Sequence, residues 1–495
     1  MFDMLRDMFG NAKITPDVEK SSVPPPSIEA VDKKTIYRNR YNYGVNLGSL
    51  FVLEKWIYND LFDNVNSNNN EYDVISQRVK NFGKDDTARR LNEHYRNYIN
   101  KINWVWLAGE VGVTVLRVPI GYWHVGNGRF VDDLPYAPLK GVYESAKPWD
   151  QLISLIGKAR AYGIGILIDI HGLPGGANTG EHSGFKNDSV KFFSTSKYVQ
   201  KMVKDVLPFI VNDVGKAYEN VVGLQIVNEA IFDNNANDQK KYYQSAIKKI
   251  ASIDNNFPVI ISDGWWPQQV SDWLKQQNLD KNAIIDTHVY RCFSDADKSK
   301  TARQLIDSLP QTVNLPKNDA DFLVGEFSCN LDEQTWNRSR DKDRQAYIKE
   351  FGLKQAQVFN SVSSWGYIFW TLQFQYGDGG AWGFVPLTNS GCIPKPLKRN
   401  MSNITENDIQ RLVQAHKNYW KDKGGEKFEY WRFEDGVRKA VSDIKAFNGF
   451  NKSRVGRWHT WKAQRRREYV AEKGDSQYMW EWDQGFQEAL DNFNL

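Results

Sequence analysis

The chain has 495 residues, a net charge of +4 and an aromatic share of 14% that includes 18 tryptophans. This length suits one large domain or two ordinary ones, and a core of that size needs no disulfides. The charge is too mild to indicate a nucleic-acid partner, and no apolar run reaches the roughly 20 residues that span a bilayer. The aromatic share fits either stacking platforms in a sugar-binding cleft or a large core with long loops, and composition alone leaves both open.

Cysteine usage and the start of the chain bear on the compartment. Cys292, Cys329 and Cys392 are widely spaced and odd in number, so they indicate neither a metal site nor a disulfide framework. The first residues lack the basic and long apolar segments of a signal peptide. We therefore expect a cytoplasmic protein in a reducing compartment. We expect no metal and no organic cofactor, and the sequence gives no oligomeric state.

Residues 1–35 are expected to be an N-terminal extension and linker. Phe2, Leu5 and Phe9 have amphipathic spacing over two turns, and a stretch rich in proline and serine follows at 21–27. The short helix either touches a membrane surface or, as is more common, docks on its own domain or stays unstructured.

Residues 36–400 are expected to form an α/β catalytic domain, because strand-like runs alternate there with helical patterns. Such alternation indicates a parallel sheet, and eight strands are the number that closes a (β/α)8 TIM barrel. An open doubly wound sheet is the competing fold, but no run leads into a glycine-rich phosphate loop before a helix. The expected strands are 43–47, 113–120, 163–170, 221–227, 258–262, 283–288, 321–326 and 365–372, and helices are expected among others at 149–161, 198–210 and 343–358.

Two of these runs end in a glutamate. The run 221–229 is apolar and β-branched, as a strand buried on both faces should be, and it ends in Asn228 and Glu229. The run 322–326 repeats this design and ends in Glu326. A carboxylate at the end of a buried strand is costly unless it is hydrogen-bonded or functional. Since the carboxyl ends of barrel strands converge, we expect paired carboxylates facing one cleft, the minimal apparatus for hydrolysing a glycosidic bond.

Other polar or aromatic residues stand at the ends of the remaining runs. A lone histidine is usually a satisfied core residue and a lone arginine often a structural ion pair, but a whole set in register is harder to explain in this way. The set comprises Asn46, Arg117, His171, His288, Tyr290 and Trp370.

These neighbours assign different tasks to the two glutamates. A hydrogen bond from Tyr290 and the charge of Arg117 are expected to keep Glu326 ionised. The negative charge of Glu326 is then expected to raise the pKa of Glu229 and keep it protonated. The amide of Asn228 is expected to bind the 2-hydroxyl of the sugar.

Two further regions leave alternatives open. The long polar stretch 59–103 is either part of a cleft wall or a tolerated surface insertion. Residues 401–495 are expected to be a mostly helical extension packed on the barrel, with a weak repeat in which 431–441 matches 480–490. We interpret each copy as the start of a helix that anchors its aromatics against the barrel, and a partner-docking surface is the alternative. The basic triplet 465–467 is more simply a solvated helix face than a nucleic-acid site.

At these strand ends the sequence resembles glycoside hydrolase family 5, the cellulase-type clan of retaining (β/α)8 glycosidases. The resemblance covers roughly residues 41–393 and is highly specific when its motifs are taken together. The motifs are Leu-Arg-Val-Pro at Arg117, Asp-Ile-His-Gly at His171, Asn228-Glu229, His288-x-Tyr290, Gly-Glu-Phe at Glu326 and Phe-Trp-Thr at Trp370.

Within the family the chain is most similar to the fungal exo-β-1,3-glucanases. The matching phrases are Gly-Val-Asn-Leu-Gly at 44–48, Val-Leu-Glu-x-Trp-Ile at 52–57 and His-Gly-x-Pro-Gly at 171–175. The resemblance implies that Glu229 is the acid/base and Glu326 the nucleophile. It also implies that Glu54 holds a terminal glucose and that Trp370 forms its stacking floor.

The third loop departs from the glucanase pattern. Those enzymes usually carry a phenylalanine and Asp-Asn before Ser-Gly, whereas this chain has Gly180-Glu181-His182. Half of the usual aromatic clamp for a second sugar is therefore missing, although Phe293 matches the other half. The secreted glucanases also have a signal peptide and disulfide-type cysteines and lack this tail, so the chain resembles an intracellular branch.

We therefore expect a retaining β-glycosidase that removes terminal β-glucosyl residues from a β-glucoside or β-glucan oligosaccharide. One alternative is a glucosidase for glucolipids such as steryl or ceramide glucosides, which the apolar N-terminus and the incomplete clamp favour. Another is a non-catalytic sugar-binding barrel, against which the two intact glutamates argue.

Overall fold

The computed structural model describes residues 23–28, 30–231, 236–396 and 400–494. The amphipathic stretch expected at the N-terminus lies outside these residues. Among the helices described, none is long and apolar enough to cross a membrane.

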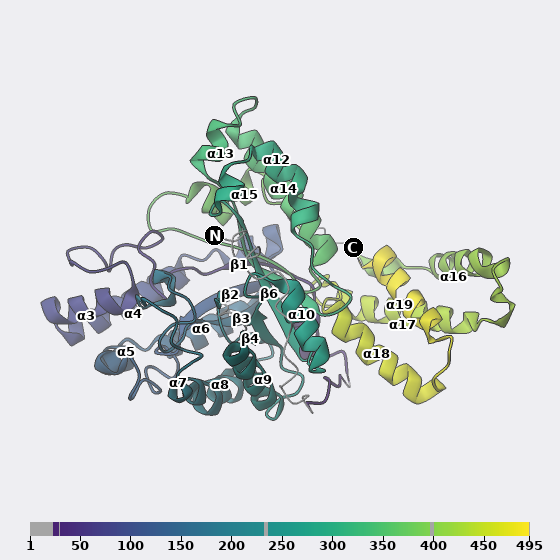
Figure 1. The fold of residues 1–495 in the computed structure, drawn as a ribbon, viewed down its shortest axis with the longest axis horizontal. Coiled ribbons are helices and arrows are strands. Elements are labelled where there is room, and N and C mark those ends of the chain that lie inside the picture. Colours follow the sequence, from purple (N-terminus) through teal and green to yellow (C-terminus); the bar gives the residue numbers. More distant parts are fainter. Residues whose placement is uncertain (1–22, 29, 232–235, 397–399, 495) are drawn as a thin grey trace.

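Eight parallel strands close into a barrel, in which each strand pairs with the next and β1 pairs with β8 (Figure 1). The strands are buried almost throughout, because helices cover the outside and layered side chains fill the inside. The expected TIM barrel is confirmed. The strands are β1 (Asn42–Asn46), β2 (Val115–Gly121), β3 (Gly165–Gly172), β4 (Val221–Gln225), β5 (Val259–Ser262), β6 (Ala283–Arg291), β7 (Asp321–Leu331) and β8 (Gly366–Phe369).

Helices follow most strands and surround the barrel (Figure 1). They are α2 (Lys33–Asn39), α3 (Glu71–Phe82), α4 (Lys84–Asn100), α5 (Lys140–Ala146), α6 (Pro148–Ala161), α7 (Ser196–Lys201), α8 (Leu207–Ile210), α9 (Asn237–Ala251), α10 (Pro267–Gln276), α11 (Asp295–Lys298), α12 (Ala302–Thr312), α13 (Glu333–Asn337), α14 (Arg344–Val362) and α15 (Phe384–Asn389). Short 3-10 or π turns are η1 (Trp106–Val111), η2 (Ala137–Leu139), η3 (Glu181–Ser183), η4 (Met202–Val206), η5 (Val211–Gly215), η6 (Gly380–Trp382), η7 (Met401–Asn403) and η8 (Gly425–Lys427).

The polar stretch 59–103 is mostly helical, because α3 and α4 occupy it. Asn70 caps α3 by accepting a hydrogen bond from the Asp73 amide. The amide of Tyr72 donates to the carbonyl of Gly184 in the loop after β3, and the Tyr72 ring contacts Phe185. The insertion therefore packs at the carboxyl end of the barrel, as the cleft-wall interpretation predicts.

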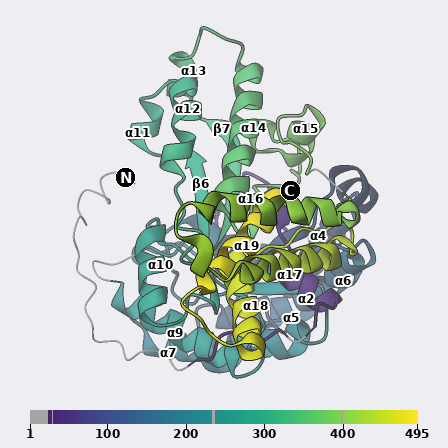
Figure 2. The same ribbon diagram turned by 90° about the vertical axis from the view of Figure 1, so that its right-hand side faces the viewer.

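The C-terminal region has its own hydrophobic core, formed largely by α16 (Glu406–Lys421), α17 (Tyr430–Asn448), α18 (Trp458–Lys473) and α19 (Met479–Phe493). Figure 2 shows these helices grouped together on one face of the molecule. The glycines of the two repeat copies, Gly436 and Gly485, lie where α17 and α19 cross. A Cβ on Gly436 would come within 2.3 Å of the Trp482 carbonyl oxygen, and one on Gly485 within 2.1 Å of the Phe433 carbonyl oxygen.

The repeat copies thus pack against each other, and the expectation that their aromatics anchor on the barrel is wrong. The reason is that glycine lets two helix backbones approach closely, which buries Phe433 and Trp482 between them. The region contacts the barrel elsewhere, through the segment before α18 and the N-terminus of α18. Both meet the N-terminal ends of the strands, where Tyr41 donates its amide to the Arg454 carbonyl and Arg40 pairs with Val455.

Candidate active site

The two glutamates meet at the carboxyl end of the barrel. Glu326 lies within β7, and a register shift between Thr287 and His288 pairs His288 with Glu326. Glu229 follows β4 with a backbone φ of 42°, a left-handed conformation that turns its side chain toward the same point. One carboxylate oxygen of each glutamate and one nitrogen of His288 lie within 4.8 Å of one another.

Arg117 on β2 is fully buried and holds the surrounding polar groups in place. Its guanidinium donates to Asn46 at 2.8 Å, to Gln225 at 2.9 Å and to Asn228 at 2.7 Å. Burial lowers the pKa of Arg117, but the charges of Asp169, Glu326 and Asp286 more than offset this effect and raise the pKa above its usual value. The arginine therefore stays charged.

Glu326 is 5% exposed and accepts hydrogen bonds on both oxygens. Arg117 donates to Oε1 at 2.8 Å, and the Tyr290 hydroxyl donates to Oε2 at 2.8 Å. His288 Nδ1 lies 3.5 Å from Oε2. Arg117 and Tyr290 are the two partners that the sequence predicted for Glu326.

Glu229 lies between two histidine rings. His288 Nδ1 is 2.8 Å from its Oε1, and His182 Nε2 is 3.1 Å from its Oε2. Burial raises the pKa of Glu229, but these two imidazoles outweigh burial and hold the pKa well below its usual value. The expectation that Glu326 keeps Glu229 protonated is therefore wrong for this arrangement, because the two adjacent cations outweigh one neighbouring anion.

The proton that Glu229 lacks is held by its neighbours. Burial lowers the pKa of His182, yet contact with Glu229 and the charges of Glu54 and Glu326 raise it to about 9. Burial also lowers the pKa of His288, but the charges of Glu326 and Asp286 outweigh burial and raise this pKa well above its usual value. Its Nε2 lies 3.0 Å from Asp286, so both ring nitrogens face carboxylates.

This protonation also bears on metal binding. Glu229, His288 and Glu326 are close enough together to ligate an ion. A histidine ligand must offer a free nitrogen lone pair. Both nitrogens of His288 already lie within hydrogen-bond distance of carboxylates, so the geometry of this set fits a proton-transfer site better than a metal site.

His171 and Trp370 lie side by side at the floor of the site. The rings are nearly parallel, at 11° and 5.9 Å between centroids, and His171 Nδ1 is 2.7 Å from Asp169. Asn228 is 1% exposed and accepts a hydrogen bond from Arg117 on its Oδ1, while its Nδ2 lies 3.5 Å from His171 Nε2. The amide N–H of Asn228 therefore remains directed toward the His171 side of the site.

Glu54 and Phe293 lie toward the rim, in the loops after β1 and β6. Glu54 is 8% exposed, and the indole N–H of Trp56 donates to it at 2.9 Å. Burial raises the pKa of Glu54. Phe293 is 54% exposed and contacts Tyr290 and Trp382.

A model of the cellulase family, glycosyl hydrolase family 5, matches residues 75–379, which is more than half of the chain. The chain belongs to glycosyl hydrolase family 5. As a family 5 member it is a glycoside hydrolase. A second model, described as the C-terminal domain of glucan 1,3-beta-glucosidase 3, matches residues 402–495.

Relatives of this family 5 enzyme include fungal proteins of similar length. An uncharacterized glycosyl hydrolase of Saccharomyces cerevisiae is 49% identical and covers 100% of both chains. Glucan 1,3-beta-glucosidase 3 of Schizosaccharomyces pombe is 29% identical over 84% of this chain and 88% of its own. Among solved structures, a rutinosidase from Aspergillus niger superposes with a TM-score of 0.55 at 20% identity, over 72% of this chain and 98% of that one, which shows the shared fold.

The structure thus brings all ten sequence-predicted residues of this family 5 enzyme to one end of the barrel or its rim. It adds Asp169 and Asp286, which orient His171 and His288. The sequence could have indicated both aspartates. Each stands two residues before a site histidine, and alternate residues of a strand lie on the same face.

Two further contacts of the family 5 site had weaker sequence signals. His182 appeared in the sequence only as a departure from the glucanase pattern, and no spacing relates it to Glu229, which it contacts. Trp56 and Trp382 face each other with centroids 5.5 Å apart, and Trp382 also contacts Tyr290. Only the high tryptophan content indicated such a wall.

Proposed function

We propose that this family 5 enzyme removes terminal β-glucosyl residues with retention of configuration, by double displacement. The observation that carries the proposal is the separation of the two carboxylates, whose oxygens lie within 4.8 Å. Retaining enzymes hold their carboxyl groups about 5–5.5 Å apart, whereas inverting enzymes leave about 6.5–9.5 Å for a water molecule.

Glu326 acts as the nucleophile in this proposal. Its oxygen bonds to the anomeric carbon as the bond from that carbon to the leaving oxygen breaks. The two hydrogen bonds from Arg117 and Tyr290 fix the orientation of the Glu326 carboxylate, which supports this role.

Glu229 acts as the acid and then the base. It passes a proton to the leaving oxygen, and later accepts a proton from the water whose oxygen displaces Glu326 from the anomeric carbon. Since His288 Nδ1 is hydrogen-bonded to one oxygen of Glu229 at 2.8 Å, a proton reaches Glu229 by transfer from this ring. His182 Nε2, 3.1 Å from the other oxygen, contributes charge to the same cluster. The net protonation of the cluster is then unchanged until the leaving group departs.

The proposed substrate is a β-1,3-linked glucan oligosaccharide or a simple β-glucoside, cleaved from its end. The name of the Schizosaccharomyces pombe relative supports this linkage. Glu54, held by Trp56 near one end of the site, is proposed to bind hydroxyls of the terminal glucose, with Trp370 beneath the ring. His171, Asn228 and His288 are proposed to contact the same sugar, and Phe293 the next one.

A glucolipid glucoside is the second candidate substrate. Trp56 and Phe293 are 52% and 54% exposed beside the site, and they offer apolar surface to an aglycone that is not a sugar. Where the glucanase pattern has the phenylalanine of the aromatic clamp, this chain has Gly180, and this substitution favours a leaving group other than glucose.

Substitution of the two glutamates tests the mechanism. Glu326→Gln should lower kcat by about 10³-fold or more on every substrate, because no covalent intermediate forms. Glu229→Gln should lower kcat/KM by about 10²–10⁴-fold on laminaribiose, but far less on 2,4-dinitrophenyl β-glucoside, whose leaving group needs no proton. Its kcat on the aryl glucoside should still fall, because the second step lacks its base. Glu181→Gln, an exposed glutamate in the same loop as His182, is the matched control and should retain activity.

Product analysis supplies the opposing outcomes. NMR of early product should show the β-anomer, and an initial α-anomer would contradict the proposed retention. Laminari-oligosaccharides, aryl glucosides and steryl glucoside in mixed micelles would be compared by kcat/KM. Tight binding of all three without turnover by the wild-type protein would contradict the proposal as a whole.

We propose further that the enzyme works in the cytoplasm. The three cysteines are free and buried, which suits a reducing compartment. A fluorescent fusion found instead in the secretory pathway would contradict this location.

A further inference from the structure

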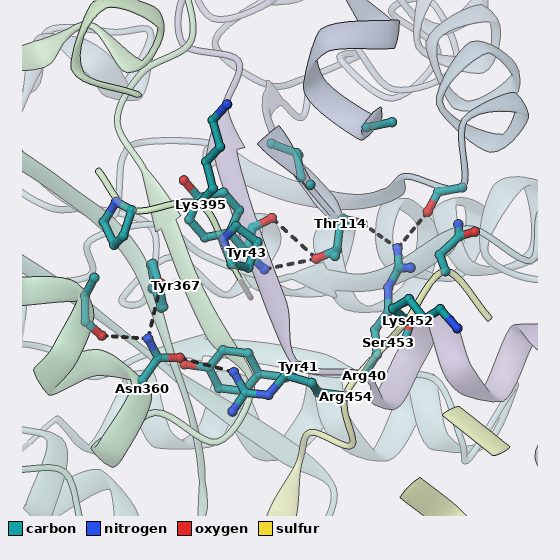
Figure 3. Close-up of a pocket in the computed structure, with 18 of the residues that line it drawn as sticks. Arg40, Tyr41, Tyr43, Thr114, Asn360, Tyr367, Lys395, Lys452, Ser453 and Arg454 are labelled. Atoms are coloured by element: carbon teal, nitrogen blue, oxygen red, sulfur yellow. Dashed lines mark hydrogen bonds between the residues drawn. The ribbon is translucent and has the colours of Figure 1, made fainter. Parts of the chain in front are cut away.

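A second cavity, of about 810 Å³, lies at the end of the barrel opposite the glutamates. Its lining comes from the residues just before β1, β2 and β3, from α14, and from the segment 451–454 that precedes α18. None of the ten candidate active-site residues lines it. The barrel and the C-terminal region therefore build this cavity together (Figure 3).

Most of the cavity wall is apolar or aromatic. Tyr41, Tyr43 and Tyr367 lie along the barrel side, as Figure 3 shows. At the mouth, three large apolar side chains are exposed to solvent, namely Val105 at 64%, Tyr162 at 41% and Leu353 at 40%. Exposed apolar groups gathered around a concavity mark a binding surface more often than isolated ones do.

The charged groups of the lining all have the same sign. Arg40, Lys395, Lys452 and Arg454 line the cavity, and among the residues that the structure describes no aspartate or glutamate does. In the described part of the chain, none of these four cations forms an ion pair with a carboxylate. Lys452 donates instead to the Asn400 amide oxygen, and Arg454 donates to the Asn360 side chain and the Asn494 carbonyl. The cavity thus combines an apolar body with positive charge that no described carboxylate pairs.

Arg40 is the deepest of these cations and is 1% exposed. Its Nη2 donates to the carbonyl oxygens of Thr114 and Gly163, while its Nε has no hydrogen-bond partner. Burial lowers the pKa of Arg40 to about 10, and the contribution that opposes burial is the Tyr37 hydroxyl. A buried cation is normally paired with a carboxylate, because leaving it unpaired is costly.

Ser453 provides a second unpartnered donor in the same wall. Its side chain is 5% exposed, and its Oγ makes no hydrogen bond. Ser453 and Arg40, both labelled in Figure 3, line the same cavity, and the backbone of Arg40 pairs with that of Val455, two residues after Ser453. Buried polar groups are nearly always hydrogen-bonded, so two unpartnered donors in the lining of one cavity indicate a group that accepts from both.

We propose that this cavity binds a soluble amphipathic anion, a carboxylate, phosphate or sulfate carried on an apolar body. The head group accepts from Arg40 Nε and Ser453 Oγ and is further attracted by Lys395, Lys452 and Arg454. The apolar body packs on the tyrosine wall and Leu353. The volume falls within the range of about 300–1,000 Å³ that holds one small molecule.

The test uses full-length protein and two fluorescent probes of nearly the same shape. 8-Anilinonaphthalene-1-sulfonate carries the anionic head, and N-phenyl-1-naphthylamine is its neutral counterpart. We expect one saturable sulfonate site that oleate empties, and at least about tenfold weaker binding of the neutral probe, because charged hydrogen bonds are lost. Equal affinity for the two probes would overturn the proposal.

Substitutions at the rim locate the site. The double variant Lys395→Glu and Lys452→Glu should weaken sulfonate binding about tenfold, whereas Lys427→Glu, an exposed lysine outside the cavity, should not. Val105→Asp at the mouth should also weaken it, and Val385→Asp, an exposed valine elsewhere, serves as its control. Equal effects of the pocket and control variants would refute the location.

Arg40→Gln tests the head-group contact directly. It should bring the affinities for the two probes close together while hydrolysis of an aryl β-glucoside persists, since the active site is at the other barrel end. If this variant does not fold, the rim variants decide the matter. Binding of inorganic phosphate as tight as that of the sulfonate would refute the amphipathic part. Binding of anionic vesicles without binding of soluble oleate would refute a single-molecule site.

Discussion

Glu229 contacts two imidazole rings, one on each carboxylate oxygen, and this contact governs how the site responds to pH. The chain reaches this position through a left-handed φ of 42°, a conformation that costs a non-glycine residue roughly 1–3 kcal/mol. The strain places Glu229 where His182 and His288 can both reach it. An acid whose proton is stored on its neighbours titrates as part of a cluster, not alone.

His182 should make stability depend on alkaline pH. Its folded pKa of about 9 exceeds the unfolded value of about 6.5, so its contribution is fully present below pH 6.5 and is lost as pH rises toward 9. Its side chain is 32% exposed, so solvent screens part of the interaction. Between pH 6 and pH 9 the wild type should lose about 1 kcal/mol more than His182→Gln in urea unfolding.

Glu229 contributes with the opposite sign. Its folded pKa is depressed, so its contribution is present above the unfolded value of about 4.5 and is lost as pH falls further.

Glu181→Gln is the control for the histidine measurement, because that glutamate is exposed beside His182. The assignment fails if His182→Gln keeps the full wild-type slope between pH 6 and pH 9.

At the scale of elements, the barrel was predictable because each strand is a short apolar run between helical patterns. All eight expected strands are present, with ends shifted by a few residues. The largest shift is in β7, which continues to Leu331, five residues beyond Glu326. Sequence placed a strand end there because a buried polar residue usually marks one, but Arg117 and Tyr290 satisfy Glu326 within the strand.

Other features depended on contacts that sequence does not encode locally. His182 contacts Glu229 from η3, a single 3-10 turn in a glycine-rich loop. The conformation of such a loop cannot be predicted from a periodic sequence pattern, because it has none. The helices α3 and α4 were hidden in a polar stretch, because their buried faces are built from tyrosines and polar residues as much as from aliphatic ones. The repeat of 431–441 at 480–490 could be recognised in the sequence, but the sequence did not show that the two copies pack against each other and not against the barrel.

Glu71, at the start of α3, joins this insertion to the active-site loops. It is completely buried, and its two oxygens accept from the Leu53 amide, Trp123 Nε1 and the Tyr143 hydroxyl, with His124 Nε2 3.0 Å away. Because Glu54 directly follows Leu53, the same contacts position the proposed glucose-binding carboxylate.

Glu71→Gln should therefore destabilise the protein and weaken substrate binding. The glutamine has the shape of the glutamate but places an N–H₂ group opposite the hydrogen-bond donors that surround Glu71. The free energy of unfolding, measured in urea, should therefore fall by about 2–4 kcal/mol. KM for a β-glucoside should rise more than kcat falls. Glu93→Gln, at an exposed glutamate paired with Arg89, should change stability by less than about 1 kcal/mol. Similar losses for the two variants would contradict a connecting role for Glu71.

At the scale of the molecule, the two ends of the barrel serve separate tasks. The glutamates lie at the carboxyl ends of the strands, and the C-terminal helices cover the opposite end. Asp321, the first residue of β7, is one of the polar links to those helices. It is fully buried and accepts from the amides of His459 and Thr460 at the start of α18, with Arg457 Nε 3.7 Å away.

The separation of these tasks predicts what Asp321→Asn will do. The amide cannot compensate the charge of Arg457 or the partial positive charge at the start of α18, so the variant should lose about 2–4 kcal/mol of stability. Limited proteolysis should then cut between the barrel and the C-terminal helices at lower protease concentrations. Activity at 25 °C should persist, because five residues of strand, about 16 Å, separate Asp321 from Glu326.

The matched control is Asp483→Asn, whose carboxylate pairs with Arg466 at the surface and should matter little. If Asp321→Asn lost kcat while remaining folded and protease-resistant, the two barrel ends would be coupled, and the C-terminal helices would have to support the active-site geometry directly. Retained kcat with faster cleavage instead means that the barrel alone orients Glu229 and Glu326, because the strands between the two ends transmit no change.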